Sequence, residues 1–306
     1  MAKAVSNKNK KNVRRRSNWY IYFISFVAAF AILGMFILGI WDYFFPDRTQ
    51  PMMNNQGIVN YVPGEELDVT ILMMMSRSQG ATPEQFMLLN YRPKSEQIVI
   101  VPLRPQTKII DGGTTTGGTM VDAYNRGGAE AVMNGIKNTF GVECKFYVKF
   151  DRLSFINFTS LLGDTVLNIP FNIDDGAASF KSGTQALTAT ELYSYITITD
   201  FSSVPGANED YRFVVMGSSL CTLINNHCKG LARASIQELF NKILNNADTN
   251  LTFKDYTIYQ QALLYNSENS VNPATYFIPT GELNEQGAFV VSENSISTIL
   301  NRFALD

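Results

Sequence analysis

The sequence predicts an α/β fold: an α/β/α layered domain with a central mixed β-sheet, preceded by one transmembrane helix. Two observations lead to this prediction. Short apolar runs of strand length alternate along most of the chain with longer stretches of helical periodicity, and such alternation produces helices packed on a sheet. Ahead of these elements, the segment from Trp19 to Trp41 contains no charged residue and is long enough to cross a bilayer as a helix.

The uncharged segment has the features of a membrane anchor. A helix of this length spans roughly 30 Å, the thickness of the hydrocarbon core. Tryptophan and tyrosine side chains stand at both of its ends, as they do at membrane interfaces. A cleaved signal peptide fits less well, because the apolar run is too long and no small-residue cleavage site follows it. We therefore expect a transmembrane helix over residues 18–45.

Charge indicates how the chain is oriented. Residues 1–17 contain seven basic residues and no acidic one. Positive charge stays on the cytoplasmic side, so we expect a cytoplasmic basic tail over 1–17, a single pass through the cell membrane and an extracytoplasmic body. Proline and glycine mark 46–64 as a linker, and the globular domain is expected over 65–306. The body is acidic, which excludes nucleic acid as an expected partner.

Apolar runs predict the strands. The first three runs are continuous rather than alternating, as in strands that are buried on both faces. The later runs are shorter and are bounded by turn residues. The expected strands are 69–75, 86–91, 97–102, 145–150, 165–169, 276–278 and 288–291.

Spacing of three or four residues between apolar positions predicts the helices. In 122–140 this spacing runs from Ala129 to Phe140, and Gly141 suits the end of a helix. The segment 111–118 is rich in glycine and threonine and reads as a loop. Further helices are expected at 152–162, 189–195, 209–225, 236–244 and 293–303.

The three cysteines and one histidine do not predict a metal or catalytic site. Cys221 and Cys228 would lie about 10 Å apart on one straight helix, too far for a disulfide. A break near Asn225 would bring them closer in a compartment that permits disulfides, so both possibilities stay open. The only histidine, His227, is expected on a solvated loop. A structural zinc site and a Ser-His-Asp triad are therefore disfavoured.

Four segments of the body resemble a known family in residues and in order. They are Leu67–Leu72, Phe86–Leu89, Ala123–Gly128 and Leu161–Pro170. Their pattern resembles the LytR-CpsA-Psr (LCP) family of cell-envelope proteins. The resemblance implies the layered fold and a transferase that moves a glycopolymer from a polyprenyl-diphosphate carrier to peptidoglycan. Such a substrate needs arginines or a divalent ion at the diphosphate, and an apolar slot for the tail.

Several charged positions of the family pattern are changed here. An aspartate is expected after the first strand, but Met73, Met74, Met75 and Ser76 stand there. These methionines are either apolar filler or part of a wall that faces lipid. Glu84 stands at the acidic position of the second motif, and the resemblance implies that it could hold Mg²⁺. One carboxylate alone holds this ion poorly.

The third motif can be matched in two registers. Matched at Pro102, the arginine position is occupied by Leu103. If one residue is inserted, Arg104 takes the arginine role and Lys108 follows four residues later. A shift of one residue along a strand turns a side chain to the other face, and a bulge is the device that permits it. Both registers therefore remain open.

Three more motifs have lost charged or amide side chains. They expect Lys and Asn, then two Arg, then a second Arg and a Gln. The residues found there, in the same order, are Thr119, Val121, Thr197, Thr199, Val215 and Met216. The first arginine of the last motif is kept as Arg212.

These departures lead to one functional expectation and two alternatives. We expect a membrane-anchored, catalytically impaired LCP-like protein that binds a polyprenyl-phosphate-linked lipid or peptidoglycan in envelope assembly. Its phosphate-binding candidates are Arg212, Arg104 and Lys108. One alternative is an active phosphotransferase with a rebuilt site that also uses Glu84. The other is a protein-binding envelope module. An apolar tunnel beside Arg212 would favour the first two readings.

Overall fold

The computed structural model describes residues 61–112, 117–176 and 178–304. The expected basic tail, the transmembrane helix and most of the linker lie outside these residues. Within the described part, no helix combines the length and the apolar character that a membrane span requires. The folded unit that contains all described residues begins at Tyr61.

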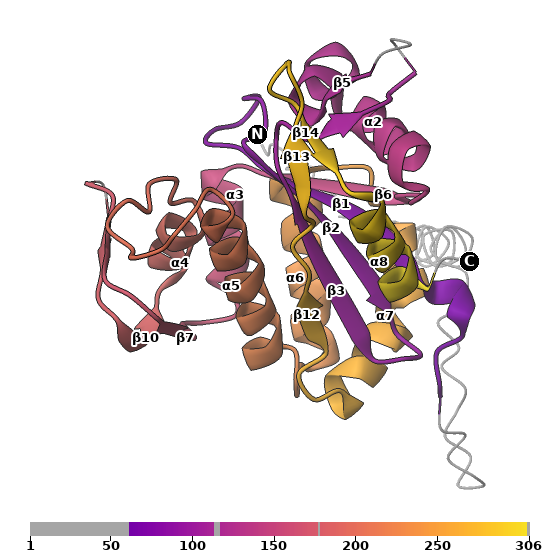
Figure 1. Cartoon of the computed structure of the whole chain (residues 1–306). Coiled ribbons are helices and arrows are strands. Elements are labelled where there is room, and N and C mark those ends of the chain that lie inside the picture. Colours follow the sequence, from indigo (N-terminus) through magenta and orange to yellow (C-terminus); the bar gives the residue numbers. More distant parts are fainter. Residues whose placement is uncertain (1–60, 113–116, 177, 305–306) are drawn as a thin grey trace, which may run out of the picture. The chain divides into compact units, whose positions relative to one another are not determined.

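Six strands form the central sheet, in the order β11-β6-β1-β2-β3-β12. Strand β1 pairs antiparallel with β2 and parallel with β6, and β3 pairs antiparallel with β2 and parallel with β12. The sheet is therefore mixed, as the sequence predicts (Figure 1). Its strands are β1 (Val69–Met75), β2 (Gln85–Arg92), β3 (Gln97–Leu103), β6 (Phe146–Phe150), β11 (Asp248–Thr249) and β12 (Ala274–Tyr276).

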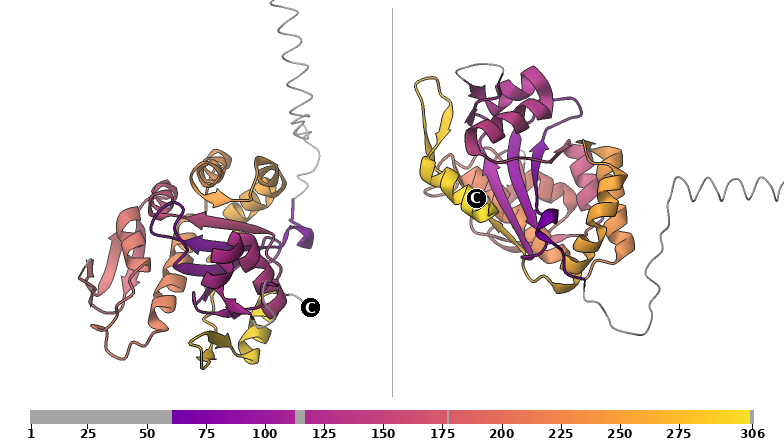
Figure 2. Two further views of the ribbon diagram at one scale, coloured as in Figure 1. Left: turned by 90° about the horizontal axis from the view of Figure 1, so that it is seen from above. Right: turned by 90° about the vertical axis from the view of Figure 1, so that its right-hand side faces the viewer.

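Helices cover both faces of this sheet (Figures 1 and 2). One face packs against α2 (Met120–Phe140) and α8 (Glu293–Phe303), and the other against α5 (Tyr211–His227), α6 (Arg233–Asn246) and α7 (Phe253–Asn269). Because side chains alternate along a strand, β1 serves both cores. Leu72 and Met74 enter the α2–α8 core, while Met73 and Met75 enter the core beneath α5 and α6.

A smaller lobe extends from the α5 side of the sheet. It is built around α3 (Arg152–Thr159) and α4 (Ala189–Ile196), which pack against each other, and α4 also packs against α5. The remaining short elements are η1 (Glu65–Leu67) and the strand pairs β4 (Lys108–Ile109) with β5 (Gly118–Thr119), β7 (Thr165–Ile169) with β10 (Gly183–Leu187), β8 (Ile173–Asp174) with β9 (Ser179–Phe180), and β13 (Gly281–Leu283) with β14 (Phe289–Val291).

Three expectations about local structure were wrong. Helix α7 was not expected at all. The strand placed at 276–278 lies at 274–276, because β12 is set by its pairing with Ile98–Ile100 of β3. Helix α5 runs on to His227, so this residue ends a helix instead of lying on a solvated loop. Its continuity also keeps Cys221 and Cys228 apart, and both are free thiols.

Candidate functional site

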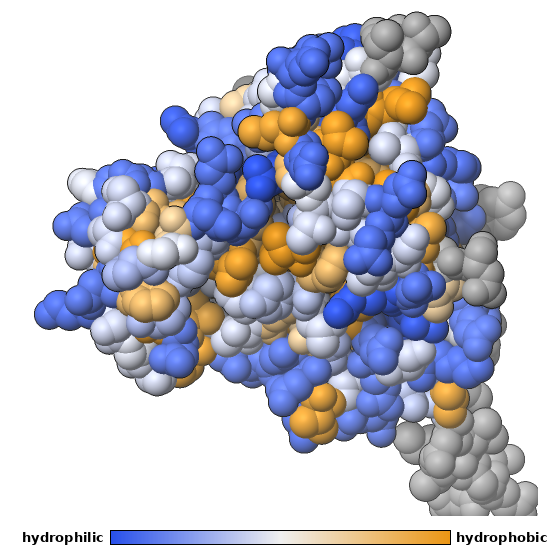
Figure 3. Space-filling view, in the orientation of Figure 1, coloured by the Kyte–Doolittle hydropathy of each residue, from blue (hydrophilic) through white to orange (hydrophobic). Residues whose placement is uncertain are grey.

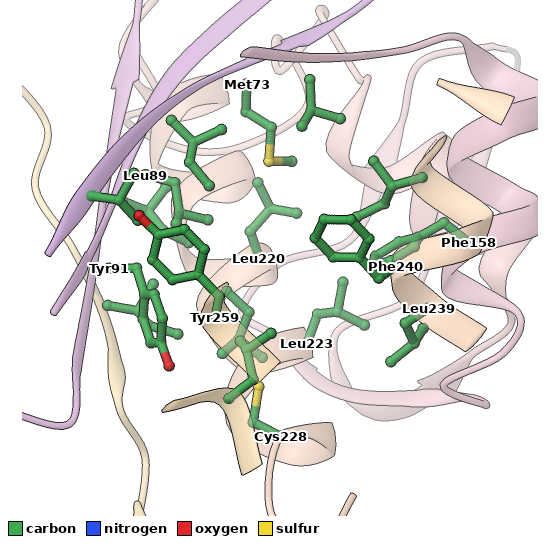
Figure 4. Close-up of a pocket in the computed structure, with 18 of the residues that line it drawn as sticks. Met73, Leu89, Tyr91, Phe158, Leu220, Leu223, Cys228, Leu239, Phe240 and Tyr259 are labelled. Carbon is green, nitrogen blue, oxygen red and sulfur yellow. The ribbon is translucent and has the colours of Figure 1, made fainter. Parts of the chain in front are cut away.

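An apolar cavity of about 340 Å³ lies between the sheet and helices α5, α6 and α7. Figure 4 shows Met73 and Leu89 from the sheet facing Leu220, Leu223 and Phe240 from the helices across this space. Its wall is almost wholly apolar. The polar lining residues include Glu96, Asn266 and Ser267. Figure 4 also shows the hydroxyls of Tyr91 and Tyr259 and the thiol of Cys228.

The volume of this cavity suits a bound ligand. It falls in the range of small-molecule sites, about 300–1,000 Å³. An apolar ligand that fills the cavity would remove the apolar side chains of its wall from contact with water, which is favourable.

Two polar pockets adjoin each other beyond the C-terminal end of β1. The first, here called the Thr197 pocket, has a volume of about 380 Å³. The second, here called the Arg104 pocket, has a volume of about 640 Å³. Thr199 and Arg212 line both. The Thr197 pocket is further lined by Met75, Ser76, Arg77, Glu84, Gln85, Arg152, Asp175, Ala178, Tyr193, Ser194 and Thr197.

The apolar cavity and the Thr197 pocket follow one another along the same face of the sheet. On β1, Met73 lines the cavity and Met75 lines the pocket. On β2, Met87 lines the cavity and Gln85 lines the pocket. Residues two apart on a strand share a face and are separated by about 7 Å. The polar pocket therefore lies one step beyond the end of the apolar cavity.

The pairing of β2 with β3 fixes where Leu103 and Arg104 of the third motif lie. Phe86 pairs with Leu103 and Met87 with Pro102 in a regular ladder without a bulge. Leu103 is buried in the α2–α8 core. The next residue, Arg104, lines the pocket that carries its name. Of the two candidates for the arginine role, the structure brings Arg104 to the site.

Arg104 is held by acidic and aromatic neighbours. Its guanidinium pairs with Asp210 and lies 3.5 Å from a carboxylate oxygen of Glu209. Its central carbon lies 4.1 Å from the ring centroid of Phe289 and 5.8 Å from that of Phe213. The charge of Arg104 is thus largely neutralised by the protein itself in this state.

Arg212 has a different environment. It lies over the ring of Phe213, with 5.0 Å between the guanidinium carbon and the ring centroid. Among the described residues no acidic side chain is within ion-pair distance of it. Burial lowers the pKa of Arg212, and the carboxylate of Glu84 opposes this only partly. An arginine so placed stays charged at neutral pH, so its positive charge is open to a ligand.

Glu84 does not provide a magnesium site by itself. Nε of Arg77 lies 2.8 Å and 2.9 Å from its two carboxylate oxygens. In the described ranges, no three Asp, Glu, His or Cys side chains gather where they could hold a metal ion. A single carboxylate already paired with an arginine does not fit Mg²⁺, which prefers carboxylate oxygens and water. The Mg²⁺ expectation stays a prediction, and no chemistry below depends on it.

The remaining candidates are spread over the molecule. Lys108 lies on β4 opposite Thr119 and lines neither polar pocket. Thr119 caps α2, and Val121 packs against the α2–α8 core, on the other face of the sheet. Val215 and Met216 are buried on α5. Thr197 and Thr199 line the site, as do Met75 and Ser76 at the position of the missing aspartate. The hydroxyl of Thr197 donates to the Tyr193 carbonyl at 2.8 Å.

Two residues of the site, Arg152 and Gln85, were not singled out in the sequence. Arg152 belongs to none of the motifs, and Gln85 stands next to Glu84 in the second motif, where the family pattern has threonine. Arg152 is the first residue of α3, directly after β6. Strands β1 and β6 are parallel neighbours, and the backbone N–H of Ser76 donates to the Phe150 carbonyl at 2.9 Å. The C-terminal ends of parallel strands meet at one edge of a sheet. That rule, applied to Met75 and Phe150, would have placed Arg152 at the site.

The surroundings of the Arg104 pocket include a hairpin. Leu283 and Gly287, from β13 and the turn that follows it, line the pocket. Leu283 and Val290 are exposed, and apolar surface is visible at this end of the molecule in Figure 3. The lining of this pocket thus combines the two arginines, Arg104 and Arg212, with an exposed apolar side chain from the hairpin, Leu283.

Comparison with known proteins agrees with the fold. A relative, the polyisoprenyl-teichoic acid–peptidoglycan teichoic acid transferase TagU of Bacillus licheniformis, is 26% identical over 172 residues. The match covers 56% of this chain and 54% of the relative, so it spans about half of that protein's length.

Solved structures show the same architecture. A crystal structure of a protein from Eubacterium siraeum has a TM-score of 0.73 at 22% identity, and the match covers 82% of this chain and 96% of that one. The structure of TagV from B. subtilis has a TM-score of 0.63 at 18% identity, covering 77% and 95%. At these identities the likeness shows the fold alone. The family model LytR_cpsA_psr matches residues 65–304, most of the chain, and the protein therefore belongs to the LytR-CpsA-Psr family.

Proposed function

We propose that this protein binds a polyprenyl-diphosphate-linked glycopolymer at the outer face of the cell membrane and has little transferase activity of its own. The prenyl tail occupies the apolar cavity, and the diphosphate occupies the polar pockets beside Arg212. The observation that carries this proposal is the succession of the two spaces along β1 and β2, where Met73 and Met75 share one face. A ligand with a long apolar tail and a charged head matches that succession.

Family membership supports the choice of ligand. The relative TagU is named for polyisoprenyl-linked teichoic acid and for peptidoglycan. The cavity also favours a lipid-binding protein over a purely protein-binding module, because its volume and apolar wall suit an apolar ligand. Peptidoglycan remains the wall partner that the family implies.

The charges of the site support low activity. A diphosphate leaving group needs positive charge placed where negative charge develops, and losing one such donor costs on the order of 10² to 10³ in rate. Here Thr197 and Thr199 stand where the family pattern has arginines, and Arg104 is already paired with Asp210. Binding requires fewer charges than catalysis, so a lipid carrier or assembly factor is the function that these residues support best.

Lipid binding can be tested on the full chain in detergent. Decaprenyl phosphate should raise the unfolding temperature by several degrees, because a ligand that binds only the folded state stabilises it by mass action. Leu223→Trp, which fills the cavity, should remove most of this shift. Ile296→Trp, in the core on the other face of the sheet, is the matched control and should keep it. An equal shift in wild type and Leu223→Trp would disprove the cavity as the lipid site.

Catalysis needs a separate assay. The purified chain, with Mg²⁺ and a polyprenyl-diphosphate substrate, should show little diphosphatase or transfer activity. Thr197→Arg combined with Thr199→Arg should increase affinity for the diphosphate, because both positions line the Thr197 pocket. Robust turnover by the unmodified protein that is abolished by Arg104→Ala would instead establish the active phosphotransferase with a rebuilt site.

A further inference from the structure

We propose that the apolar cavity holds only about the first three isoprene units of a prenyl tail, and that Tyr91 closes the end of the cavity farthest from the polar pocket. The remaining units of a longer tail leave the cavity sideways, past α6. This inference deepens the proposed function and rests on it for the prenyl nature of the ligand. It adds a limit on tail length and names the residue that sets the limit.

Three rows of side chains form the sheet side of the cavity. The first row, next to the polar pocket, is Met73 of β1 with Met87 of β2. The last row, here called the far end, is Val69 of β1 with Tyr91 of β2 and Ile98 of β3. Successive rows on one face of a sheet are about 7 Å apart, so the cavity extends roughly 13 Å along the strands.

The length and the volume of the cavity agree on how many isoprene units it holds. An extended unit has four carbon–carbon bonds of about 1.5 Å each, which makes it roughly 4–5 Å long. Its five carbon atoms occupy roughly 100 Å³ at the packing density of a protein interior. A length of roughly 13 Å and a volume of about 340 Å³ each accommodate about three units. The tail of decaprenyl phosphate, which has ten units, is therefore too long for the cavity.

Hydrogen bonds hold the far end closed. Tyr91 is 7% exposed, and its hydroxyl donates to Oδ1 of Asn266 on α7 at 2.6 Å. Nδ2 of Asn266 donates in turn to the carbonyl of Pro93, which follows β2, at 2.9 Å. Beside them, Oγ of Ser267 donates to the carbonyl of Leu231 at 3.0 Å. These bonds join β2, α7 and the turn before α6, so the ring of Tyr91 is fixed across the end of the cavity.

The side of the cavity at α6 is held less firmly. Within α6, all of which the structure describes, Ile236 alone is buried. Leu239, Phe240 and Ile243 line the cavity but stay partly exposed (Figure 4). The helix begins after Ala232, whose side chain gives no capping hydrogen bond. A helix with few buried apolar contacts and an uncapped start moves at low cost, so this is the side where a tail can leave.

The test measures how affinity depends on tail length. Geranyl, farnesyl, geranylgeranyl and decaprenyl phosphates, with two, three, four and ten isoprene units, are titrated calorimetrically into the full chain in detergent. In wild type the affinity should rise about tenfold from two to three units, because more apolar surface is buried, and by less than about twofold from three to ten. Leu223→Trp, which fills the cavity, gives the background from partitioning of each lipid into micelles.

Two substitutions should move the limit in opposite directions. Tyr91→Leu shortens the side chain at the far end, so geranylgeranyl phosphate should bind about fivefold more tightly than to wild type, and geranyl phosphate equally. Leu89→Trp closes the cavity one row nearer to the polar pocket, so farnesyl phosphate should lose about tenfold and geranyl phosphate less than about threefold. Tyr91→Phe is the matched control. It keeps the ring, loses only the bond to Asn266, and should keep the limit at three units.

Contrary results overturn defined parts of this inference. A steady rise in affinity from farnesyl to decaprenyl phosphate in wild type would mean that the protein encloses the whole tail. An unchanged length dependence in Tyr91→Leu, or the same extension in Tyr91→Phe, would mean that the ring of Tyr91 does not set the limit. Urea unfolding without lipid shows whether each variant folds. Should Tyr91→Leu not fold, Leu89→Trp decides, because unchanged binding of farnesyl phosphate would place the tail elsewhere.

The exit past α6 has its own measurement, hydrogen–deuterium exchange followed by mass spectrometry. With decaprenyl phosphate bound, the amides of α6 should exchange faster than with farnesyl phosphate bound, because the additional units hold the helix away from its neighbours. The amides of α5, which has many buried residues, serve as the internal control and should not differ. Equal exchange of α6 with the two lipids would place the exit elsewhere.

The same titrations separate this inference from the proposed function. If prenyl phosphates of every length bind no better to wild type than to Leu223→Trp, the proposed function fails. If they bind to wild type but the affinity rises steadily with length, the proposed function stands and the limit fails. If only the short prenyl phosphates bind, with the limit at three units, the limit stands, and the ligand is a short prenyl phosphate instead of a polyprenyl carrier.

Discussion

Arg104 and Arg212 line the same pocket, but within the described residues Arg104 alone of the two has carboxylates at ion-pair distance. These are Asp210 and Glu209, at the start of α5, whereas Arg212 lies over the ring of Phe213. An anionic ligand that approaches Arg104 must therefore displace or repel a carboxylate. Asp210 and Glu209 thus compete with an anionic ligand for Arg104, and they lower the affinity of the pocket for anions.

Removing the negative charge of Asp210 should strengthen the binding of phosphate to the pocket. Asp210→Asn leaves Arg104 without its nearest carboxylate, so we expect affinity for inorganic phosphate to rise several-fold, in the range of a charge-assisted hydrogen bond. Calorimetric titration of the full chain measures this change. Glu143→Gln, which breaks the exposed pair with Lys137, is the matched control. Weaker binding by Asp210→Asn would mean that Asp210 positions Arg104 for the ligand instead of competing with it.

His227 makes stability depend on pH. Burial lowers its pKa, a hydrogen bond with the backbone of Asp164 opposes this only partly, and its ring lies 3.3 Å from the hydroxyl of Thr165. The folded state favours the neutral ring, so the unfolded chain takes up the extra proton as the pH falls. The stability that neutral His227 contributes is present above about pH 6.5 and is lost below it.

A variant without the ring should lose this dependence. We expect the free energy of unfolding of the wild type to fall between about pH 7 and pH 5, and to fall less in His227→Asn. Urea unfolding at several pH values measures both. Carboxylates also titrate in acid, so the difference between the two proteins is the informative quantity. If the difference in unfolding free energy between the two proteins does not change with pH, the pKa of His227 is not lowered in the folded state.

Residue positions were predictable only where they depend on local pattern. Whether Leu103 or Arg104 faces the site could not be predicted from the sequence, because this depends on how β3 pairs with β2. Arg152 lies outside the motifs and Gln85 replaces a threonine within one of them. The meeting of β1, β2 and β6 at one edge of the sheet brings both residues to the site. The kept Arg212 was recognisable because a motif surrounds it.

At the scale of elements, α5 connects the site to the sheet. It carries Arg212 and Phe213 at its first turn, and further along it packs on β3 and β12. The approach is close at Gly217, where an added Cβ would lie 2.9 Å from Cδ2 of Tyr276 and 3.2 Å from Cγ of Pro102. No room remains for a methyl group, so the position of the helix depends on this glycine.

Gly217→Ala should therefore destabilise the fold despite a better helix propensity. The propensity gain is about 1 kcal/mol, while overpacking a core costs typically 1–3 kcal/mol. We expect a net loss of about 1 kcal/mol in urea unfolding, and weaker phosphate binding because Arg212 moves with the helix. The neighbouring change Ser218→Ala should have little effect on either quantity. A more stable Gly217→Ala protein would show that α5 shifts without cost.

Some helices and strands can be predicted from their apolar patterns alone, and others cannot. Strands β1, β2 and β3 are continuous apolar runs, and their prediction from such runs is confirmed. Helix α7 was missed because its buried positions include Tyr256, Tyr259 and Ser267. Tyrosine and serine on a polar background give a weak periodic signal. Tyr259 is buried by contact with Tyr91 of β2 and Phe146 of β6, and Tyr256 lies against the ring of Phe240 of α6. The sequence alone does not show these tertiary contacts.

At the scale of the whole molecule, the order of apolar runs was enough to predict a layered α/β domain with a mixed sheet. The cavity was not predictable, because its volume depends on how far α5, α6 and α7 stand from the sheet. Apolar side chains such as Leu220, Leu223 and Phe240 would look the same in a filled core. Packing, rather than composition, decides whether such residues enclose a ligand.

The expected membrane topology is a further prediction at this scale. The basic tail over 1–17 should stay inside the cell, and the body should lie outside. Protease added to intact cells, or to spheroplasts where a wall blocks access, should digest the body and spare an epitope placed at the N-terminus. A fully protected body would refute the proposed orientation and, with it, access to a carrier at the outer leaflet.

The lining of the apolar cavity also contains a cysteine, Cys228, that can be labelled chemically. Burial raises the pKa of Cys144 and Cys221 to about 12, and that of Cys228 to about 11. Only Cys228 among the three is partly exposed, and it lines the cavity. Since thiolates are the reactive form, a maleimide dye at mildly alkaline pH should attach first at Cys228. The unmodified chain thus carries its own labelling position, from which an environment-sensitive fluorophore would report in real time when the cavity changes from wet to filled.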